Sequence, residues 1–287
     1  MIIIKLCGGL GNQMFQYALY TKFKTLGENV KLDKHDIENH FNSHQTNIFE
    51  VFELDTAGIF CDDAEKLSDR KQDILSKVRR RVIGRKKSHY VERIEGKYDD
   101  EIFKLSNKYL DGYWQTEKYF VDIRDAVLKT YQFNNELDDK NRDMLERITN
   151  AENSVSIHVR MGDYNTELNK KIYGNICTEQ YYEGAMKYFE ENYNNPCFFV
   201  FSNEPQKIGK IGTHGNVTVV DTNSALDTAW IDMFLMSKCK HNIIANSTFS
   251  WWAAWLNVYS QKKVIAPKKW INNQEMIDIC PTEWIRL

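Results

Sequence analysis

Polar side chains follow four apolar segments in the second half of the chain, at the point where each segment ends. In chain order they are His158, Arg160, Ser202, Asn203, Glu204, Asp221, Thr222, Asn246, Ser247 and Thr248. Continuous apolar runs are typical of parallel strands that are covered on both faces. Because open α/β sheets bind ligands outside the carboxyl ends of their strands, the sequence predicts one polar ligand site where these ends meet.

Arg160 carries the side chain in this set that best suits a phosphate group. It lies two residues after His158, so we expect both side chains on one face of their strand. A guanidinium group offers a planar fork of donors that matches phosphate oxygens. The alternative is a structural ion pair with Asp163, which an isolated Arg-x-x-Asp spacing would favour. The neighbouring polar strand ends favour the phosphate site.

A second phosphate-binding feature is expected at Ser247 and Thr248, where a strand turns into a helix. Hydroxyl side chains cap helix starts, and the free amides of a first helical turn attract phosphate. The alternative is an ordinary N-cap at the start of a packing helix. Trp251, Trp252 and Trp255 follow in that helix, and we expect them in the core rather than on a stacking surface.

The glycine-rich loop GGLGNQ at residues 8–13 lies between an apolar strand and a helix. Together with Asp33, at the end of the next strand, it raises the alternative of an NAD-binding fold. Met14, however, stands where the dinucleotide fingerprint needs a small residue, and no P-loop lysine follows the glycines. The polar pair Asn12 and Gln13 at the helix start favours hydrogen bonds to a sugar or phosphate.

No metal site is expected from the sequence. The chain has no Asp-x-Asp motif for a metal-bound diphosphate. His35, His40 and His44 have helical spacing, but in their asparagine-rich surroundings we expect solvated side chains rather than ligands. A diphosphate without a metal needs positive charge from the protein, which again selects Arg160.

Two series of alternating strands and helices run along the chain, with a boundary near residue 150. In the first series we expect strands at 2–7, 29–33 and 109–114 and helices at 12–26, 117–130 and 136–149. In the second we expect strands at 154–159, 197–201, 217–220, 243–245 and 264–266 and helices at 178–193, 205–211, 226–239 and 248–259. The sequence therefore predicts an α/β protein with two Rossmann-like domains, 1–150 and 151–287, facing each other across a cleft.

The composition is that of an ordinary globular protein. Of the 287 residues, 42% are hydrophobic, and the formal net charge is -2, which argues against disorder and against a general nucleic-acid binder. The six cysteines form no close pair, which favours a reducing cytoplasm. No apolar run approaches the roughly 18 residues that would span a bilayer, and we expect neither export nor a membrane span.

A basic segment lies between Lys77 and Lys87. Seven of its eleven residues are Lys or Arg and none is acidic, while Val78 and Val82 continue a helical stripe from Ile74. Two interpretations stay open. One is weak peripheral contact with an anionic membrane surface, and the other is a solvated helix face.

Three segments together resemble the α-1,2-fucosyltransferases of glycosyltransferase family 11. They are GGLGNQMFQYA at residues 8–18, HVRMGDY at 158–164 and IANSTFSWWAAW at 244–255. The segments FVFSNE at 199–204 and DMFLMS at 232–237 are similar to two further family segments. The resemblance extends over nearly the whole chain and is weakest from about residue 35 to 105.

This resemblance implies a GT-B fold in which residues 151–287 bind the donor GDP-β-L-fucose and residues 1–150 bind most of the acceptor. It implies an inverting, metal-independent transfer of L-fucose to the 2-hydroxyl of a galactose, in an O-antigen, another surface polysaccharide or an oligosaccharide, free or lipid-linked. No cofactor and no nucleic acid partner are implied. Separately from the resemblance, the cysteines predict the cytoplasm, and the basic segment leaves open peripheral contact at the inner face of the cytoplasmic membrane.

The resemblance also assigns roles to residues. The donor-binding set is His158, Arg160, Ser202, Asn203, Glu204, Asp221, Asn246, Ser247, Thr248, Phe249 and Ser250, and the acceptor or reacting-sugar set is Gly9, Gly11, Asn12 and Gln13. Within the first set, residues 247–250 are expected at the phosphates, and His158 with Asn203 or Glu204 at the guanine or ribose. In the second set, Asn12 is expected to border the reacting sugar. Met161 stands where the family usually has a second arginine, so Arg160 is expected to carry more of the diphosphate charge.

The catalytic residues implied are Arg160 and Asp163. Arg160 and the helix amides would stabilise the charge that develops on the departing GDP. Asp163 and Glu204 are candidates for the general base, although either could instead orient Arg160 or bind nucleotide, and a base from the first domain is an equal alternative. Two other functional classes stay open: an NAD-dependent oxidoreductase and a non-catalytic binder of nucleotide sugars or glycans.

Overall fold

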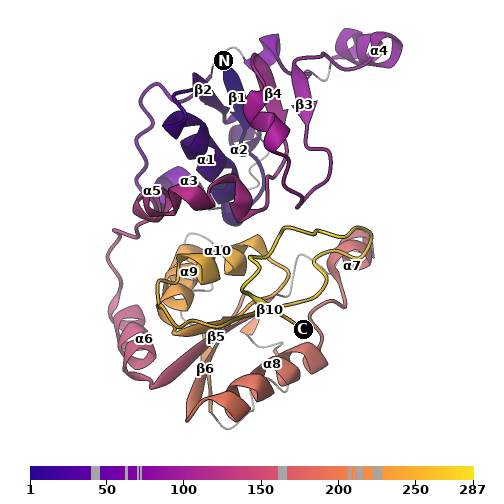
Figure 1. Ribbon diagram of the computed structural model, residues 1–287. Helices are drawn as coiled ribbons and strands as arrows, with labels where there is room; N and C mark the ends of the chain where they lie inside the picture. The colour runs from indigo at the N-terminus through magenta and orange to yellow at the C-terminus, as the bar shows by residue number, and fades with distance from the viewer. Residues whose placement is uncertain are drawn as a thin grey trace. The chain divides into compact units, whose positions relative to one another are not determined.

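The computed structural model divides the chain into two compact units, unit 1 (Met1–Gln132) and unit 2 (Phe133–Leu287), each built around one sheet (Figure 1). It describes residues 1–39, 46–61, 64–69, 71, 73–160, 167–205, 208–209, 211, 216–221, 223 and 228–287. Every strand pairing in both sheets is parallel, which is the arrangement that alternating strands and helices predict.

Unit 1 has a four-stranded sheet in the order β2-β1-β4-β3. Its strands are β1 (Ile2–Lys5), β2 (Val30–Asp33), β3 (His89–Val91) and β4 (Lys108–Asp111). Its helices are α1 (Leu10–Thr25), α2 (His35–Asn39), α3 (Ile48–Val51), α4 (Ile74–Ile83) and α5 (Arg124–Thr130), with short 3-10 turns η1 (Ala64–Lys66), η2 (Asp100–Lys104), η3 (Glu117–Tyr119) and η4 (Val121–Ile123). Ile2, Ile3 and Ile4 are all buried, because β1 lies inside the sheet with covered faces.

The parallel register of unit 1 brings strand ends together at one edge. Lys5 at the end of β1 pairs with Asp33 at the end of β2, and Asp111 ends the neighbouring strand β4. The glycine-rich loop leaves β1 at this edge and leads into α1. This edge of unit 1 therefore carries the loop that the sequence predicted to contact a sugar or phosphate.

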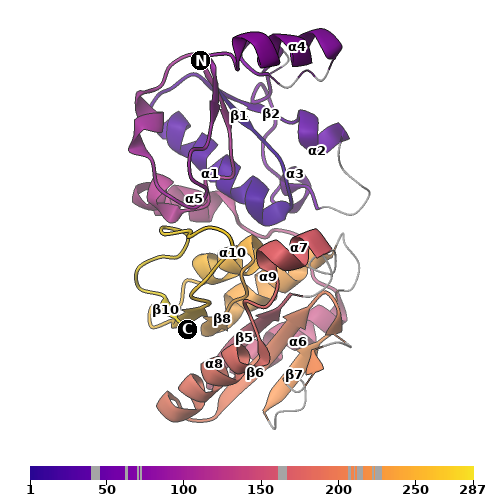
Figure 2. The same cartoon turned by 90° about the vertical axis from the view of Figure 1, so that its right-hand side faces the viewer.

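Unit 2 has a six-stranded sheet in the order β10-β9-β8-β5-β6-β7. Its strands are β5 (Asn153–Val159), β6 (Pro196–Ser202), β7 (Val217–Val220), β8 (His241–Ile243), β9 (Val264–Ala266) and β10 (Ile285–Arg286). Its helices are α6 (Asp139–Asn150), α7 (Glu167–Tyr173), α8 (Glu179–Asn192), α9 (Ala229–Lys238) and α10 (Thr248–Leu256). Figure 2 shows α8 on one face of this sheet and α9 with α10 on the other.

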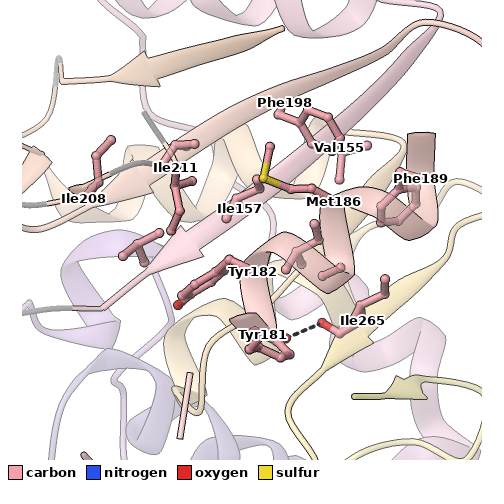
Figure 3. Packing of buried hydrophobic residues seen from close by; sticks show 14 residues of the cluster. Val155, Ile157, Tyr181, Tyr182, Met186, Phe189, Phe198, Ile208, Ile211 and Ile265 are labelled. Carbon is pink, nitrogen blue, oxygen red and sulfur yellow. Dashed lines mark hydrogen bonds between the residues drawn. The ribbon is translucent and has the colours of Figure 1, made fainter. Parts of the chain in front are cut away.

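The core of unit 2 fixes the direction in which β5 presents its side chains. Val155 and Ile157 are fully buried and pack with Met186 and Phe189 of α8 (Figure 3). The Tyr181 hydroxyl donates to the Ile265 carbonyl at 3.2 Å, which ties α8 to β9. Since side chains alternate along a strand, His158 points to the opposite face, toward α10.

The units divide between Gln132 and Phe133, earlier than the boundary near residue 150 that the sequence predicts. The helix α6 belongs to unit 2 because its side chains bond there. Asn141 Nδ2 donates to Asn223 Oδ1 at 3.0 Å, and Arg147 Nη2 donates to Thr218 Oγ1 at 2.9 Å. A boundary of this kind depends on contacts between residues far apart in the chain, which local pattern does not encode.

Other element predictions also differ from the structure. The single helix expected at 117–130 is broken into η3, η4 and α5, and the sequence missed β3, α7 and β10. The helix expected at 205–211 lies partly outside the described residues. Within the described part of the chain, no helix combines the length and the apolar character needed to cross a membrane.

Candidate functional site

His158 lies at the carboxyl end of β5 with only 7% of its surface exposed. Its carbonyl accepts a hydrogen bond from the Tyr182 hydroxyl at 3.0 Å, and its ring centre lies 5.7 Å from that of Phe249. Among the described residues, none is a hydrogen-bond partner for its buried Nδ1 atom. Burial, and secondarily the positive charge of Arg160, lowers the pKa of His158 to about 3, so the imidazole is neutral at neutral pH.

Arg160 and Ser247 meet across the sheet, although 87 residues separate them. Arg160 Nη1 donates to Ser247 Oγ at 3.0 Å. Ser247 is the N-cap residue of α10 by position, yet its side chain makes no capping hydrogen bond. Its hydroxyl oxygen therefore orients the guanidinium group and leaves the first-turn amides of α10 without a side-chain cap.

Buried side chains of α10 fix the position of the helix start. Trp251 and Trp252 are completely buried and Trp255 is 1% exposed, which confirms that the tryptophans are core residues. Trp251 Nε1 donates to the Ile279 carbonyl at 2.6 Å, and Ser250 Oγ donates to the Ser247 carbonyl at 3.3 Å. Thr248 and Phe249 are half-buried at the helix start. A rigid helix N-terminus next to a guanidinium group favours a bound anion.

Asn246 bonds to two loops of unit 2. Its Nδ2 donates to the carbonyls of Tyr173 and Trp270 at 3.1 and 3.0 Å, and its Oδ1 accepts from the Cys177 thiol at 3.5 Å. Both amide hydrogens are therefore used inside the protein. In this structure Asn246 fixes the loops around the strand ends.

The end of β6 lies beside the end of β5, since Val159 pairs with Ser202. Ser202 is buried, and its Oγ accepts a hydrogen bond from the Glu204 amide at 3.1 Å, which forms a tight turn. Asn203 is exposed and Glu204 half-buried in that turn. Asp221 is exposed after β7, while Asp163 and Thr222 lie outside the described residues.

Arg160, His158, the start of α10 and the β6 turn are thus brought to one edge of the unit 2 sheet. The guanidinium charge and the helix N-terminus both favour a negatively charged ligand. The neutral imidazole supplies a ring nitrogen for an uncharged hydrogen bond. This combination suits a ligand with a phosphate part and a neutral polar part.

Gly8 and Gly9 in the glycine-rich loop of unit 1 differ in why the position holds a glycine. Gly8 has φ 78°, and a Cβ there would lie 2.6 Å from Asn12 Nδ2, so the backbone requires glycine. Gly9 has an ordinary φ of -68°, and a Cβ there would meet nothing within 4 Å. Open space at Gly9 therefore leaves room for a ligand to approach the backbone at the N-terminus of α1. Gly11 is buried within α1.

Asn12 and Gln13, at the start of α1, differ in exposure. Asn12 is half-buried, and its Oδ1 accepts from Gln115 Nε2 at 2.9 Å. Gln13 is completely buried; its Nε2 donates to the Gly8 carbonyl at 2.9 Å and its Oε1 accepts from the Ile48 amide at 3.1 Å. Gln13 therefore holds the glycine loop to α3 with both ends of its amide.

Glu92 is a half-buried carboxylate that the sequence reasoning missed. Its Oε2 accepts from the amides of Tyr113 and Trp114 at 2.7 and 3.2 Å, and these residues precede Gln115, the partner of Asn12. Desolvation raises the pKa of Glu92 to about 7. Trp114 has a φ of 57°, unusual for a bulky residue. The sequence feature that could have predicted this site is the segment GYWQ at residues 112–115, directly after β4.

Asp33, whose carboxylate an NAD site would need for the ribose, forms hydrogen bonds inside unit 1. It is 4% exposed; its Oδ2 accepts from the Tyr109 hydroxyl at 2.9 Å and its Oδ1 from the His35 amide at 3.1 Å. This geometry argues against NAD binding. Within the residues described, no three His, Cys, Asp or Glu side chains group in a way that could hold a metal ion. His35 is exposed, and His40 and His44 lie outside the described residues.

The sequence is similar to one protein family and to curated bacterial relatives over its whole length. The model of the family described as "Glycosyl transferase family 11" matches residues 1–287. The chain is 34% identical over 303 residues to an Escherichia coli "Alpha-1,2-colitosyltransferase", covering 100% of this chain and 99% of the relative. It is 32% identical over 312 residues to the E. coli "O-antigen biosynthesis glycosyltransferase WbnK", covering 98% and 99%.

More distant proteins are similar to parts of the chain or to its fold. The human "Galactoside alpha-(1,2)-fucosyltransferase 1" is 26% identical over 155 residues, which cover 51% of this chain and 42% of that protein. The structure is similar to that of the NodZ α-1,6-fucosyltransferase of Bradyrhizobium soaked with GDP-fucose, with a TM-score of 0.52 and coverage of 89% and 92%. At 18% identity, this last likeness concerns the fold alone.

Proposed function

Because the chain belongs to glycosyltransferase family 11 and has the GT-B fold, we propose that it is an inverting α-1,2-fucosyltransferase. The donor is GDP-β-L-fucose, and the acceptor is the 2-hydroxyl of a galactose in a glycan. Relatives named for galactoside fucosylation and for O-antigen biosynthesis support this substrate class. The family resemblance of residues 8–18, 158–164 and 244–255 leads to the same conclusion.

The observation that carries the proposal is the hydrogen bond from Arg160 to Ser247 at the uncapped start of α10. It holds a guanidinium fork beside free helix amides, which is where the two phosphates of GDP would bind. His158 offers its unpartnered Nδ1 atom to the guanine or ribose. Gly9 and Asn12, at the edge of unit 1, are assigned to the acceptor and the reacting sugar.

Inversion follows from one in-line attack of the acceptor hydroxyl on the anomeric carbon of fucose. The bond from that carbon to the β-phosphate oxygen breaks, and GDP leaves with an additional negative charge. Arg160 and the α10 amides meet that charge, so they stabilise the transition state more than the ground state. The hydroxyl proton goes to a general base, for which Asp163, Glu204 and a group of unit 1 are the candidates. Asp163→Asn and Glu204→Gln test the first two, because only loss of the base removes the acidic limb of the pH–rate profile. If both variants keep that limb, the base belongs to unit 1.

We further propose that the reaction needs no metal ion. Arg160 supplies fixed positive charge, and the helix N-terminus adds its dipole, so the departing diphosphate is neutralised by the protein. Activity should therefore be unchanged in EDTA. Loss of most turnover in EDTA, with recovery in manganese or magnesium, would contradict this part of the proposal.

A second donor candidate is GDP-colitose, because a relative with 34% identity over the full chain is named a colitosyltransferase. Colitose is L-fucose without its 3-hydroxyl, so the two donors share the diphosphate and differ at one sugar position. A site that hydrogen-bonds the 3-hydroxyl would reject the deoxy sugar strongly, whereas an apolar site would accept both. Competition between the two donors measures this discrimination directly.

The compartment proposed is the cytoplasm. All six cysteines are free thiols, and burial raises the pKa of Cys177, Cys239 and Cys280, which keeps them protonated and unreactive. Free thiols of this kind are typical of a reducing compartment.

The experiment is a GDP-release assay with a panel of β-galactosides and GDP-fucose, GDP-colitose or GDP-mannose as donor. We expect GDP release only when donor and galactoside are both present, and a 1,2-linked α-fucoside by NMR. Calorimetry with GDP and NAD is the control for the oxidoreductase class. Binding of GDP-fucose without release on any galactoside would instead support a non-catalytic binder.

A further inference from the structure

The helix α4 carries a row of apolar side chains that nothing in the described structure covers. Its ten residues are all described, and none is buried. Ile74, Leu75, Val78, Val82 and Ile83 are 79%, 82%, 54%, 77% and 77% exposed. Ile74, Leu75, Val78 and Val82 share about 100° of the helix circumference, and Ile83 lies beyond them. Exposed apolar side chains grouped in this way are typical of an interaction surface. We call this set the α4 apolar row.

The row is presented by a helix whose other side is fixed. Arg79 forms an ion pair with the buried carboxylate of Asp69, and Arg80 Nη1 donates to the Asp69 carbonyl at 2.7 Å. Helical periodicity of about 100° per residue places Arg80 about 160° from both Val78 and Val82, on the opposite side of the helix. Arg79 lies between Leu75 and Ile83, at the edge of the apolar side chains. The row therefore faces outward.

The ends of α4 are also defined. Asp73 caps the start by accepting from the Ser76 amide at 2.9 Å, and Gly84 ends the helix with φ 87°. The helix lies beyond β3, which is one of the two edge strands of the unit 1 sheet (Figure 1). A capped and anchored helix keeps its shape while its apolar row stays open to a partner.

The charge beside the row selects the partner. Lys77 and Arg81 flank the row, and Arg85 and Lys87 follow it; all four are exposed. No acidic residue occurs between Lys77 and Lys87. Apolar side chains rimmed by exposed cations are the features of a helix that lies in the interface of an anionic membrane. A second copy of the same helix would bring these cations together, which disfavours dimerisation.

We propose that α4 binds an anionic lipid bilayer, with the α4 apolar row among the upper acyl chains and Lys77, Arg81, Arg85 and Lys87 at the headgroups. The sequence left membrane contact and a solvated face as equal alternatives. The exposed apolar row favours membrane contact, because leaving Leu75 and Ile83 in water is unfavourable and a solvated helix face would carry polar side chains there. The proposal rests on the geometry of α4 and needs no assumption about the reaction.

The test is flotation of the whole protein with vesicles of phosphatidylcholine alone or with about 30% phosphatidylglycerol. We expect at least about tenfold more bound protein on the anionic vesicles in low salt, and a partial loss in high salt. The partial loss distinguishes an apolar insertion from a purely electrostatic contact, which high salt would abolish.

Two variants separate the row from general surface effects. Leu75→Glu/Val82→Glu places carboxylates in the row, and we expect at least about tenfold weaker binding to anionic vesicles. Val258→Glu is the matched control, because Val258 is 73% exposed in unit 2, and it should bind as the parent does. Circular dichroism melts of both variants should match the parent, since the substituted side chains are exposed.

Three results would overturn the proposal. One is equal binding to neutral and anionic vesicles, and another is unchanged binding of the double variant. The third is a parent protein that does not float but elutes as a dimer that the double variant converts to monomer, which would assign the row to a second copy of the chain. None of these readouts uses a sugar donor, so failure here is distinct from failure of the proposed transferase activity.

Discussion

The two sheets of this protein have similar carboxyl edges, but the polar groups there are used differently. At the unit 1 edge, Gln13 has its amide bonded to backbone atoms of the same unit. At the unit 2 edge, Arg160 donates to the hydroxyl of Ser247, and the start of α10 keeps amides without a side-chain cap. The first edge mainly fixes its own loops, and the second places a guanidinium group beside helix amides that have no side-chain cap.

This difference fits the proposal that unit 1 binds the acceptor and unit 2 binds the donor. A rigid loop with open space at Gly9 can admit a neutral sugar without strong polar contacts. A diphosphate instead needs preorganised positive charge in the protein. Such charge lowers the folding stability of the free protein until an anionic ligand binds to it. We therefore expect substitutions at the unit 1 edge to act mainly on folding, and substitutions at the unit 2 edge to act mainly on turnover.

The largest effect should come from Arg160. Arg160→Lys keeps the charge but loses the planar fork, and we expect turnover with GDP-fucose to fall by on the order of 10² to 10³, or about 3 to 4 kcal/mol. Arg160→Ala should lose more, since Met161 provides no neighbouring guanidinium. Steady-state kinetics measure both losses, and thermal melts should stay close to the parent.

The matched control is Arg147→Lys, because Arg147 also donates to a hydroxyl, Thr218 Oγ1, at 2.9 Å on the surface of unit 2. It should leave turnover unchanged. If Arg160→Lys lowers turnover by about threefold or less, which is below about 1 kcal/mol, Arg160 has no part in transition-state stabilisation. The contrast between the two edges would then disappear.

Glu92 should give unit 1 a pH-dependent stability. Desolvation raises its pKa to about 7 from an ordinary 4.5, so between these values the folded chain holds a proton that the unfolded chain has released. The free energy of unfolding should therefore fall as pH rises from 4.5 to 7, by at most about 3 kcal/mol, and then level off. Urea denaturation at several pH values measures this slope.

Glu92→Gln is neutral at every pH and can still accept from the Tyr113 and Trp114 amides, so its slope should be smaller than that of the parent. Asp232 in unit 2 also has a raised pKa, about 7. Its contribution to the pH dependence of the unfolding free energy should remain in the variant. Glu101→Gln, at an exposed position, is the control. Identical slopes for parent and Glu92→Gln would show that Glu92 does not titrate in this range.

Gln13→Ala should affect folding rather than donor binding. The substitution leaves the Ile48 amide and the Gly8 carbonyl without their side-chain partner, and we expect a loss of about 2 kcal/mol in unfolding free energy. Gln261→Ala, at an exposed position, should change it by less than about 0.5 kcal/mol. Calorimetry with GDP should give an affinity for folded Gln13→Ala within about threefold of the parent. A large loss of GDP affinity at parental stability would reverse the assignment of the unit 1 edge.

Ser247→Ala should give a smaller loss of turnover, about tenfold, because Arg160 keeps its charge but loses the hydroxyl that orients it. Ser237→Ala is matched to it, since Ser237 is also nearly buried and donates to a carbonyl within α9. We expect turnover of the control within about a factor of two of the parent. If the two variants behave alike, the hydroxyl of Ser247 serves the fold and does not serve Arg160.

The sequence by itself determined the parts of this protein that depend on local pattern. Apolar runs and glycine turns predicted β1, β2 and most strands of unit 2, because burial on both faces of a sheet requires continuous apolar residues. The same pattern located Arg160, Ser202 and Ser247 at strand ends. The motifs at 8–18, 158–164 and 244–255 indicated the family.

Only the tertiary structure decided how each polar group is used. Gln13 bonds to a backbone amide 35 residues away, and Ser247 serves Arg160 across 87 residues, so no spacing in the sequence reveals either partner. Glu92 stayed hidden because its burial depends on β4 and the turn after it. Ile74, Val78 and Val82 were visible as a stripe, but such a stripe is normally covered by a core. Only their exposure in the folded chain, together with that of Leu75 and Ile83, supports the proposed contact with a partner.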